Sequence, residues 1–339
     1  MKRNTLIAAG LAVLIGGSLA GYGVMRKNAE IVSEVEPDIV LCYGEVNPEG
    51  HVLTESAHYF ADKVKELSGG KMLIEIYPSG QMGDDARCYQ ALKMGALDLY
   101  RGNSMSLAVC DNPMVSVLAL PYMFRDREHF WDVCNSEVGE QILLDLADGT
   151  GMIGLAYLDE GPRNFFTTDK PIKRLEDMKD LKIRMPVSDM MLDTVTALGA
   201  TPVPIAYAEL YTALESGTVD GAENPPVSYY FNRFYKVAPN YVKDRHTFSP
   251  GVILASQRTW NSLEQSYQDV ILEAARLTQE YNKTVIEEAD RKAYEEMQKA
   301  GVTVTELEDP DAWNAAMEPV YQKYGAQYLD LIREVRGMR

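Results

Sequence analysis

The sequence predicts an α/β protein of two lobes joined by a long helix, and three observations support this. From Asp38 onward, strand-like and helix-like segments alternate. One helix-glycine-strand pattern occurs twice, far apart in the chain, and the residues from Ser262 to about Lys299 have helical spacing without glycine or proline. Alternating strands and helices are typical of a parallel sheet covered by helices. The 339 residues are enough for two cores.

The first part of this region reads strand, helix, strand, helix, strand. The strands are apolar or alternate in polarity, and the first helix carries its apolar residues on one side before Ser68-Gly69-Gly70 ends it. This order predicts parallel strands with covering helices. The five segments are residues 38–44, 52–67, 72–77, 84–94 and 96–100.

The repeated pattern is Tyr-x-Ala-Leu-x-x-Gly-x-(Leu/Val)-Asp, at Tyr89–Asp98 and again at Tyr211–Asp220. A glycine that takes positive φ can end each helix before a short strand. Two lobes built from similar units fit this pattern, and the alternative is a chance likeness of a common unit. If the lobes face each other, Asn103 and Asn224, which follow the two copies, become polar contacts on opposite walls of one cleft.

The later segments continue the α/β pattern. The helix from Ser262 to Lys299 would extend about 55 Å and would cross between the lobes as a hinge or strut. The alternative is two helices with a break near Asn282. The remaining expected segments are strands at 151–158, 181–186, 247–255 and 302–305, and helices at 127–146, 187–198 and 311–335.

Arg184 lies where the strand 181–186 runs into the following helix, which is where α/β folds place ligand sites. A guanidinium can grip a carboxylate with two parallel hydrogen bonds. The alternative is an ordinary surface arginine. Arg163 occupies a similar place just beyond the strand 151–158, so the two arginines together favour a site for an organic acid. His246 either lines the same cleft or only begins a strand.

The N-terminus predicts export. Lys2 and Arg3, an apolar run and Ser18-Leu19-Ala20 have the order of a signal peptide. The uncharged run is also long enough to span a bilayer, so residues 1–27 are either a signal peptide or a retained anchor. Residues 28–37 read as a tether. Either way, the working protein lies outside the cytoplasmic membrane, in the periplasm or tethered at the cell surface.

Charge and motifs exclude several classes of function. The net charge of −17 repels nucleic acid and anionic lipid. Nucleotide-binding and hydrolase motifs are absent, and the spacing of the four histidines matches no metal site, so we expect no metal and no cofactor. His58 and His129 read as helix-surface residues. The four cysteines predict neither a metal site nor an assigned disulfide: Cys42, Cys88, Cys110 and Cys134.

From about Asp38 to the C-terminus, the chain resembles the solute-binding proteins of tripartite ATP-independent periplasmic (TRAP) transporters, of the dicarboxylate-binding-protein type. Each motif is modest alone, and together, in this order, they are specific. They are Tyr77-Pro78-Ser79-Gly80-Gln81-Met82-Gly83, Leu120-Pro121-Tyr122, Gly161-Pro162-Arg163, Leu181-Lys182-Ile183-Arg184-Met185-Pro186, Glu209-Leu210-Tyr211 and Val219-Asp220-Gly221-Ala222-Glu223-Asn224-Pro225.

The resemblance implies a two-lobe fold like that of periplasmic binding proteins, with a long interdomain hinge helix. We expect lobe I to comprise residues 38–160 and 249–288, and lobe II to comprise residues 161–248 and 289–339. The implied partners are a small organic acid and the small and large membrane subunits of a permease, with no nucleic acid and with the protein as a monomer.

The resemblance also implies a ligand site. Arg184 would bind the ligand carboxylate, with Arg163 beside it and Asn224 steering the ligand. The first lobe would contribute around Glu45 and Asn47 and around Arg101 and Asn103. Tyr207 and Tyr229 are candidates for stacking on the ligand, and His246 completes the set. Relatives that bind sialic acid have an acidic residue at the position that resembles Asn103. The asparagine here argues against sialic acid as the ligand.

Sugar acids such as uronates or aldonates are the ligands that the resemblance favours. C4-dicarboxylates and 2-keto acids are the alternatives. A function of another class is an exported sugar-acid lyase, which would need a base poised near neutral pH, such as His246 or Tyr211. A ligand-sensing protein that serves a receptor has the same sequence features.

Overall fold

The computed structural model describes residues 36–109 and 114–338. Val35–Arg339 forms one compact unit. The expected signal or anchor, almost all of the tether, and Cys110 lie outside the described residues. Within the described part of the chain, no helix is long and apolar enough to cross a membrane.

The first lobe is the part of the chain built on a five-stranded sheet in the order β2-β1-β3-β10-β4. β1 is parallel to both of its neighbours, whereas β10 runs antiparallel to β3 and β4. The expected opening order of strands and helices is therefore present. The elements are β1 (Ile39–Gly44), α1 (Val52–Leu67), β2 (Met72–Tyr77), α2 (Asp85–Met94), β3 (Leu99–Asn103), β4 (Met152–Leu158) and β10 (Gly251–Ser256).

The second lobe is the part built on a six-stranded sheet in the order β11-β9-β5-β8-β6-β7. β6 is parallel to β7 and β8, and β5 runs antiparallel to β8 and β9. The elements are β5 (Asn164–Thr167), β6 (Lys182–Met185), α6 (Asp189–Ala197), β7 (Thr201–Pro204), α7 (Leu210–Glu215), β8 (Gly221–Asn224), α8 (Pro226–Phe231), β9 (Asn240–Lys243) and β11 (Thr303–Glu306).

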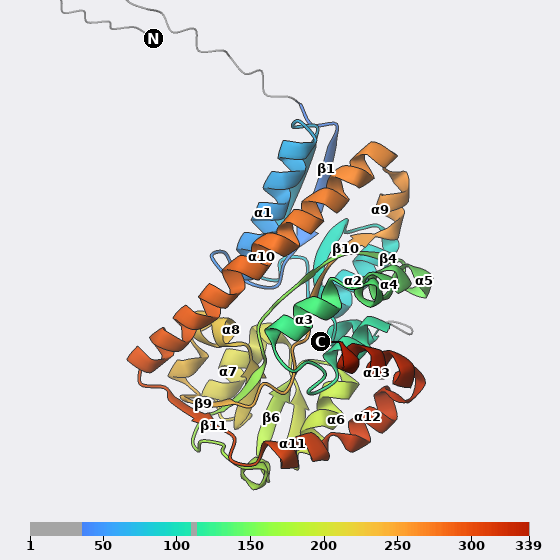
Figure 1. Cartoon of the computed structure of the whole chain (residues 1–339). Coiled ribbons are helices and arrows are strands. Elements are labelled where there is room, and N and C mark those ends of the chain that lie inside the picture. The colour runs from blue at the N-terminus through green and yellow to red at the C-terminus, as the bar shows by residue number, and fades with distance from the viewer. Residues whose placement is uncertain (1–35, 110–113, 339) are drawn as a thin grey trace, which may run out of the picture. The chain divides into compact units, whose positions relative to one another are not determined.

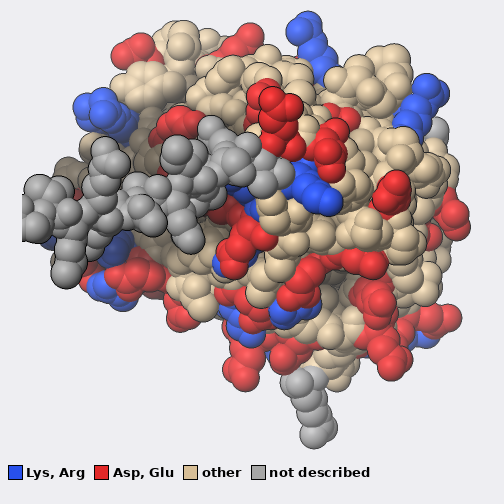
Figure 2. All heavy atoms as spheres, turned by 90° about the horizontal axis from the view of Figure 1, so that it is seen from above, with Lys and Arg blue, Asp and Glu red and all other residues tan. Residues whose placement is uncertain are grey.

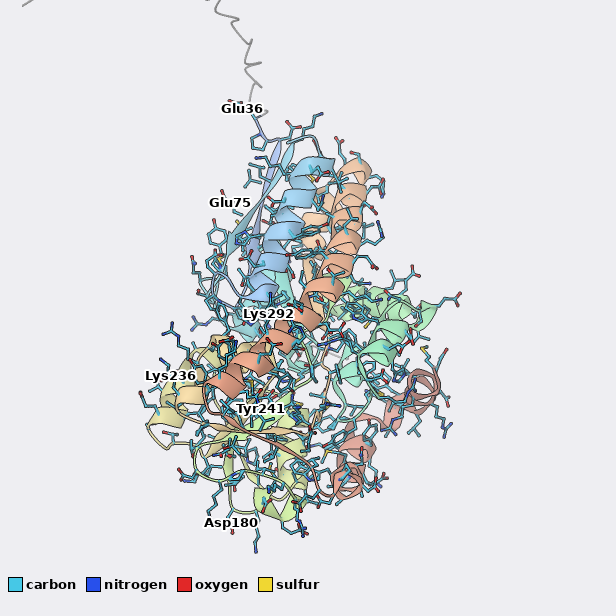
Figure 3. The ribbon with its side chains drawn as sticks, turned by 60° about the vertical axis from the view of Figure 1, so that its left-hand side comes forward. Glu36, Glu75, Asp180, Lys236, Tyr241 and Lys292 are labelled. Carbon is cyan, nitrogen blue, oxygen red and sulfur yellow. The ribbon has the colours of Figure 1, made fainter. Side chains whose placement is uncertain are left out.

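One continuous helix, α10 (Gln265–Lys299), contacts elements of both lobes. It packs on α1 and β4 of the first lobe and on α8 of the second. In Figure 1 it passes from the α1 side of the molecule toward β9. Figure 3 shows Lys292 on the part of α10 nearer to Tyr241 of the second sheet. The alternative of two helices broken near Asn282 is wrong, since Asn282 is a buried residue in the middle of α10.

The repeated sequence pattern is a repeated structure. Gly95 and Gly217 both take positive φ after the helices α2 and α7, and each is followed by a strand, β3 or β8. The aspartate that ends each copy has the same role. Asp98 Oδ2 accepts a hydrogen bond from the backbone N–H of Cys42 at 2.9 Å, and Asp220 Oδ2 accepts one from Lys182 at 2.7 Å. Each aspartate thus fastens its strand to the neighbouring parallel strand.

The region expected as one helix at 127–146 is instead two, α3 (Arg127–Cys134) and α4 (Glu137–Asp145). Ser136 separates them because its hydroxyl accepts a hydrogen bond from the N–H of Gly139 and caps α4. His129, expected on a helix surface, is buried, and its Nε2 contacts the carbonyl oxygen of Val335 at 2.8 Å.

The remaining helices complete both lobes. Trp313 of α11 is buried in the largest apolar core, together with Phe165 and Phe130. Cys42, Cys88 and Cys134 are free thiols. The remaining helices are α5 (Ala147–Thr150), α9 (Gln257–Ser262), α11 (Pro310–Ala316), α12 (Glu318–Tyr324) and α13 (Leu329–Gly337).

Candidate functional site

Arg184 is a buried arginine with no carboxylate partner among the described residues. Its neighbours in β6, Ile183 and Met185, enter the apolar core, and Arg184 points to the other face of the strand, where it is 2% exposed. Its Nε donates to the carbonyl oxygen of Ile205 at 2.8 Å. Burial lowers the pKa of Arg184 to about 10, since the nearby carboxylate of Glu223 compensates only in part. The site therefore holds a guanidinium whose positive charge lacks a direct partner.

Arg163, by contrast, is paired. Its Nε donates to Oε2 of Glu223, and its Nη2 donates to Oε1 of the same carboxylate at 2.8 Å. The antiparallel register of β5 and β8, in which Asn164 lies opposite Asn224, brings the two side chains together. Burial acts to raise the pKa of Glu223, but the charge of Arg163 and the contact with His246 hold it at about 2.

His246 lies wholly buried behind this ion pair. Its Nδ1 is 2.6 Å from Oδ2 of Asp244, and its Nε2 is 3.6 Å from Oε2 of Glu223. Burial alone would lower the pKa of His246, yet the two carboxylates raise it to about 9. An imidazole that is protonated at neutral pH cannot act as the base that a lyase would need.

The first lobe contributes a second charged group, centred on Arg101. Nε and Nη2 of Arg101 donate to the two carboxylate oxygens of Glu45 at 2.7 and 2.8 Å, and Nη1 donates to Glu160. Asn47 donates both its backbone N–H and its amide to Glu45 Oε1, at 2.8 and 2.9 Å. The amide of Asn103 donates to Glu160 Oε2 at 2.8 Å. All five side chains are buried.

Tyr207 connects the groups of the two lobes. It lies in a short 3-10 helix after β7, and the centre of its ring is 5.9 Å from the guanidinium carbon of Arg184. Burial raises the pKa of Tyr207 to about 12, while Arg163, Arg184 and Arg101 each act to lower it. Arginines of both lobes therefore lie within electrostatic range of one phenol.

A direct contact joins the two lobes. Nε2 of His51, at the start of α1, is 3.2 Å from the hydroxyl of Ser228 in α8. Nδ1 of His51 accepts a hydrogen bond from the N–H of Leu53, so Nε2 carries the ring proton. Nε2–H therefore donates a hydrogen bond to the hydroxyl oxygen of Ser228. Burial lowers the pKa of His51 to about 4, so this imidazole is neutral at pH 7.

Asn224, the last residue of β8, is buried and offers an unused donor. Among the described residues, its side-chain nitrogen has no hydrogen-bond partner. A buried amide donor of this kind suits an anionic or hydroxyl-rich ligand. Tyr229, also considered for stacking, lies in the core of the second lobe, where its hydroxyl donates to the carbonyl oxygen of Ala238.

The structure thus brings the nine predicted site residues into one charged region. Asn103 and Asn224 end β3 and β8 rather than following them. Sequence reasoning missed Glu160, Glu223 and His51. An available signal was that each of the two glutamates directly precedes a motif residue, in Glu160-Gly161-Pro162-Arg163 and Glu223-Asn224. In the described ranges, no group of three or more histidine, cysteine, aspartate or glutamate side chains is placed to hold a metal ion.

Comparison with known proteins places this chain in a family. The model of the bacterial extracellular solute-binding proteins, family 7, matches residues 43–327. The C4-dicarboxylate-binding protein DctB of Bacillus subtilis is 29% identical over 343 residues, which cover 98% of this chain and 97% of DctB.

Solved structures agree with this match. A TRAP periplasmic solute-binding protein from Bradyrhizobium sp. BTAi1, in complex with α/β-D-galacturonate, is 32% identical with a TM-score of 0.85, covering 88% of this chain and 99% of its own. One from Pseudomonas putida F1, with bound D-glucuronate, is 27% identical with a TM-score of 0.84, covering 87% and 96%. The chain therefore belongs to family 7 of the bacterial extracellular solute-binding proteins, the solute-binding proteins of TRAP transporters.

Proposed function

We propose that this protein captures a sugar acid, such as a uronate or aldonate, outside the cytoplasmic membrane and delivers it to the small and large membrane subunits of a TRAP permease. The observation that carries the proposal is Arg184, a buried guanidinium that no carboxylate neutralises among the described residues. A ligand carboxylate would supply the missing charge. The low-dielectric surroundings would strengthen that pair relative to the same pair in water.

The groups around Arg184 suit the rest of a sugar acid. Asn224 has a free donor, Tyr207 presents a ring, and Glu45 and Glu160 present carboxylate oxygens that can accept from hydroxyl groups. The relatives solved with D-galacturonate and D-glucuronate favour the same ligand class. A C4-dicarboxylate is the second candidate, because the Bacillus subtilis relative binds that class.

The ligand would be released to a membrane partner. TRAP solute-binding proteins bind small organic acids and work with permease subunits. We propose that this chain acts as a monomer, exported by its N-terminal segment, and that ligand binding fixes the lobes in the arrangement which the permease recognises. The contact of His51 with Ser228 lies at that junction and would form when the lobes close.

Calorimetry on Arg184→Lys tests the proposal. Lysine keeps the charge but cannot form two parallel hydrogen bonds to the ligand carboxylate. We therefore expect the affinity for galacturonate or glucuronate to fall at least about tenfold. The matched control is Arg174→Lys, an arginine whose side chain is 64% exposed, and it should bind like the wild type. Unchanged affinity in Arg184→Lys, or no melting shift with any sugar acid, would contradict the proposal.

A further inference from the structure

The charges of the candidate site are unbalanced between the two lobes. In the first lobe, one guanidinium serves two carboxylates, because all three nitrogens of Arg101 donate to Glu45 or Glu160. That side therefore carries one negative charge in excess. Burial raises the pKa of Glu160 above its ordinary value in spite of Arg101 and Arg163, as expected for a carboxylate that shares its counter-charge.

The second lobe carries the opposite imbalance. Arg163 and Glu223 neutralise each other, and so do His246 and Asp244. Arg184 remains as one positive charge without a direct partner in the described chain. A ligand that fits both sides has a carboxylate at one end and neutral hydroxyl groups at the other.

We propose that the site accepts acids with a single carboxylate and rejects diacids, and that Glu160 is the specificity-determining residue that excludes a second carboxylate. This inference rests on the proposed function and narrows it, since it separates uronates and aldonates from aldarates and C4-dicarboxylates. Carboxylate oxygens accept hydrogen bonds from sugar hydroxyls, whereas a second ligand carboxylate facing them is repelled.

The close approach of Gly251 leaves room for the Glu160 carboxylate. Glu160 follows β4, and its side chain packs against Gly251, where an added Cβ would lie 2.6 Å from Glu160 Oε1. Any larger residue at position 251 would displace the carboxylate. Asn103 fixes the other oxygen, and its amide also donates to Ser249 Oγ at 3.1 Å. Glu160 is 8% exposed, so water does little to weaken its repulsion of a second anion.

Matched pairs of acids test the inference. Calorimetry at pH 7.5 would compare galacturonate with galactarate and gluconate with glucarate, pairs that differ by a second carboxylate. We expect the monoacid of each pair to bind at least about 100-fold more tightly in the wild type. In Glu160→Gln, which keeps the shape and removes the charge, the ratio should fall at least about tenfold. The control is Glu215→Gln, an exposed glutamate of α7, which should leave the ratio unchanged.

The outcomes separate the two proposals. Equal binding of galacturonate and galactarate would overturn the inference and leave the sugar-acid function intact. The same holds if Glu160→Gln folds, binds galacturonate and keeps the wild-type ratio. Binding of diacids alone, or of no acid in either pair, would overturn both. If Glu160→Gln fails to fold, Glu45→Gln removes the neighbouring charge and should lower the ratio in the same direction.

Discussion

His246 links the acid–base state of a single buried side chain to the stability of the whole protein. Its pKa of about 9 lies above the ordinary 6.5 because Asp244 and Glu223 face it. The protonated ring therefore stabilises the folded state fully below pH 6.5, and this stabilisation is lost as the pH rises through 9. At its maximum it amounts to about 3 kcal/mol.

Urea unfolding at pH 6.5 and at pH 9.5 measures this effect. The wild type should lose stability between the two pH values, and His246→Asn, which keeps a donor to Asp244 but cannot titrate, should lose much less. His58→Asn serves as the control, because His58 is an exposed histidine beside Glu49. An equal pH dependence in wild type and His246→Asn would show that the imidazole does not carry the charge.

At the scale of residues, the sequence predicted where Arg184 lies but not what surrounds it. A strand that runs into a helix is a local pattern, and it identified the arginine. The pairing of Arg163 with Glu223 depends on the register of β5 against β8. No local pattern encodes that register, so sequence reasoning treated Arg163 as a free donor. Whether Arg163 also touches the ligand stays a prediction.

The helix α10 is more than a strut, because it fastens the end of β4. The side chain of Asn282 accepts from the N–H of Asp159 at 2.8 Å and donates to the carbonyl oxygen of the same residue at 3.2 Å. About two helical turns further along α10, Asp290 forms an ion pair with Arg127. Arg127 also forms an ion pair with the carboxylate of Asp159. The chain enters the second lobe directly after this anchored segment.

Asn282→Ala would leave both backbone groups of Asp159 without these partners in a buried place. We expect the free energy of unfolding to fall by about 2 kcal/mol, as measured by urea denaturation. Glu280→Ala, at an exposed position on the same helix, should change it by less than about 0.5 kcal/mol. A small effect at Asn282 would mean that water replaces the amide and that α10 does not fix this crossing.

Elements with long or repeated signals were predictable, and short ones were not. The helix α10 and the two copies of the helix-glycine-strand unit follow from periodicity and from glycines that take positive φ. β5 and β9 have four residues each, and their partners are distant in the sequence. The break before α4 came from a serine cap inside a helical pattern, where the cap outweighed the continuing apolar spacing.

At the scale of the whole molecule, the protein carries a charge of the same sign as its proposed ligand. The net charge is −17, and Figure 2 shows acidic side chains spread over the face in view, with basic ones among them. Arg184 is a single buried positive charge set against this net negative charge. An approaching acid thus meets a repulsive field before it reaches the guanidinium, and the affinity of the site has to come from close contacts.

This predicts an unusual dependence of binding kinetics on salt. Because salt screens the long-range repulsion while the buried contacts persist, the association rate constant for galacturonate should rise about two- to fivefold between about 20 mM and about 500 mM NaCl. Stopped-flow fluorescence on the native tryptophans would measure it, with Arg174→Lys as a charge-conserving control. The dissociation rate constant should change less, since the pair at Arg184 is shielded from the solvent. An association rate constant that falls with salt would mean that basic groups near the site outweigh the net charge. Electrostatic attraction would then speed the approach of the ligand instead of slowing it.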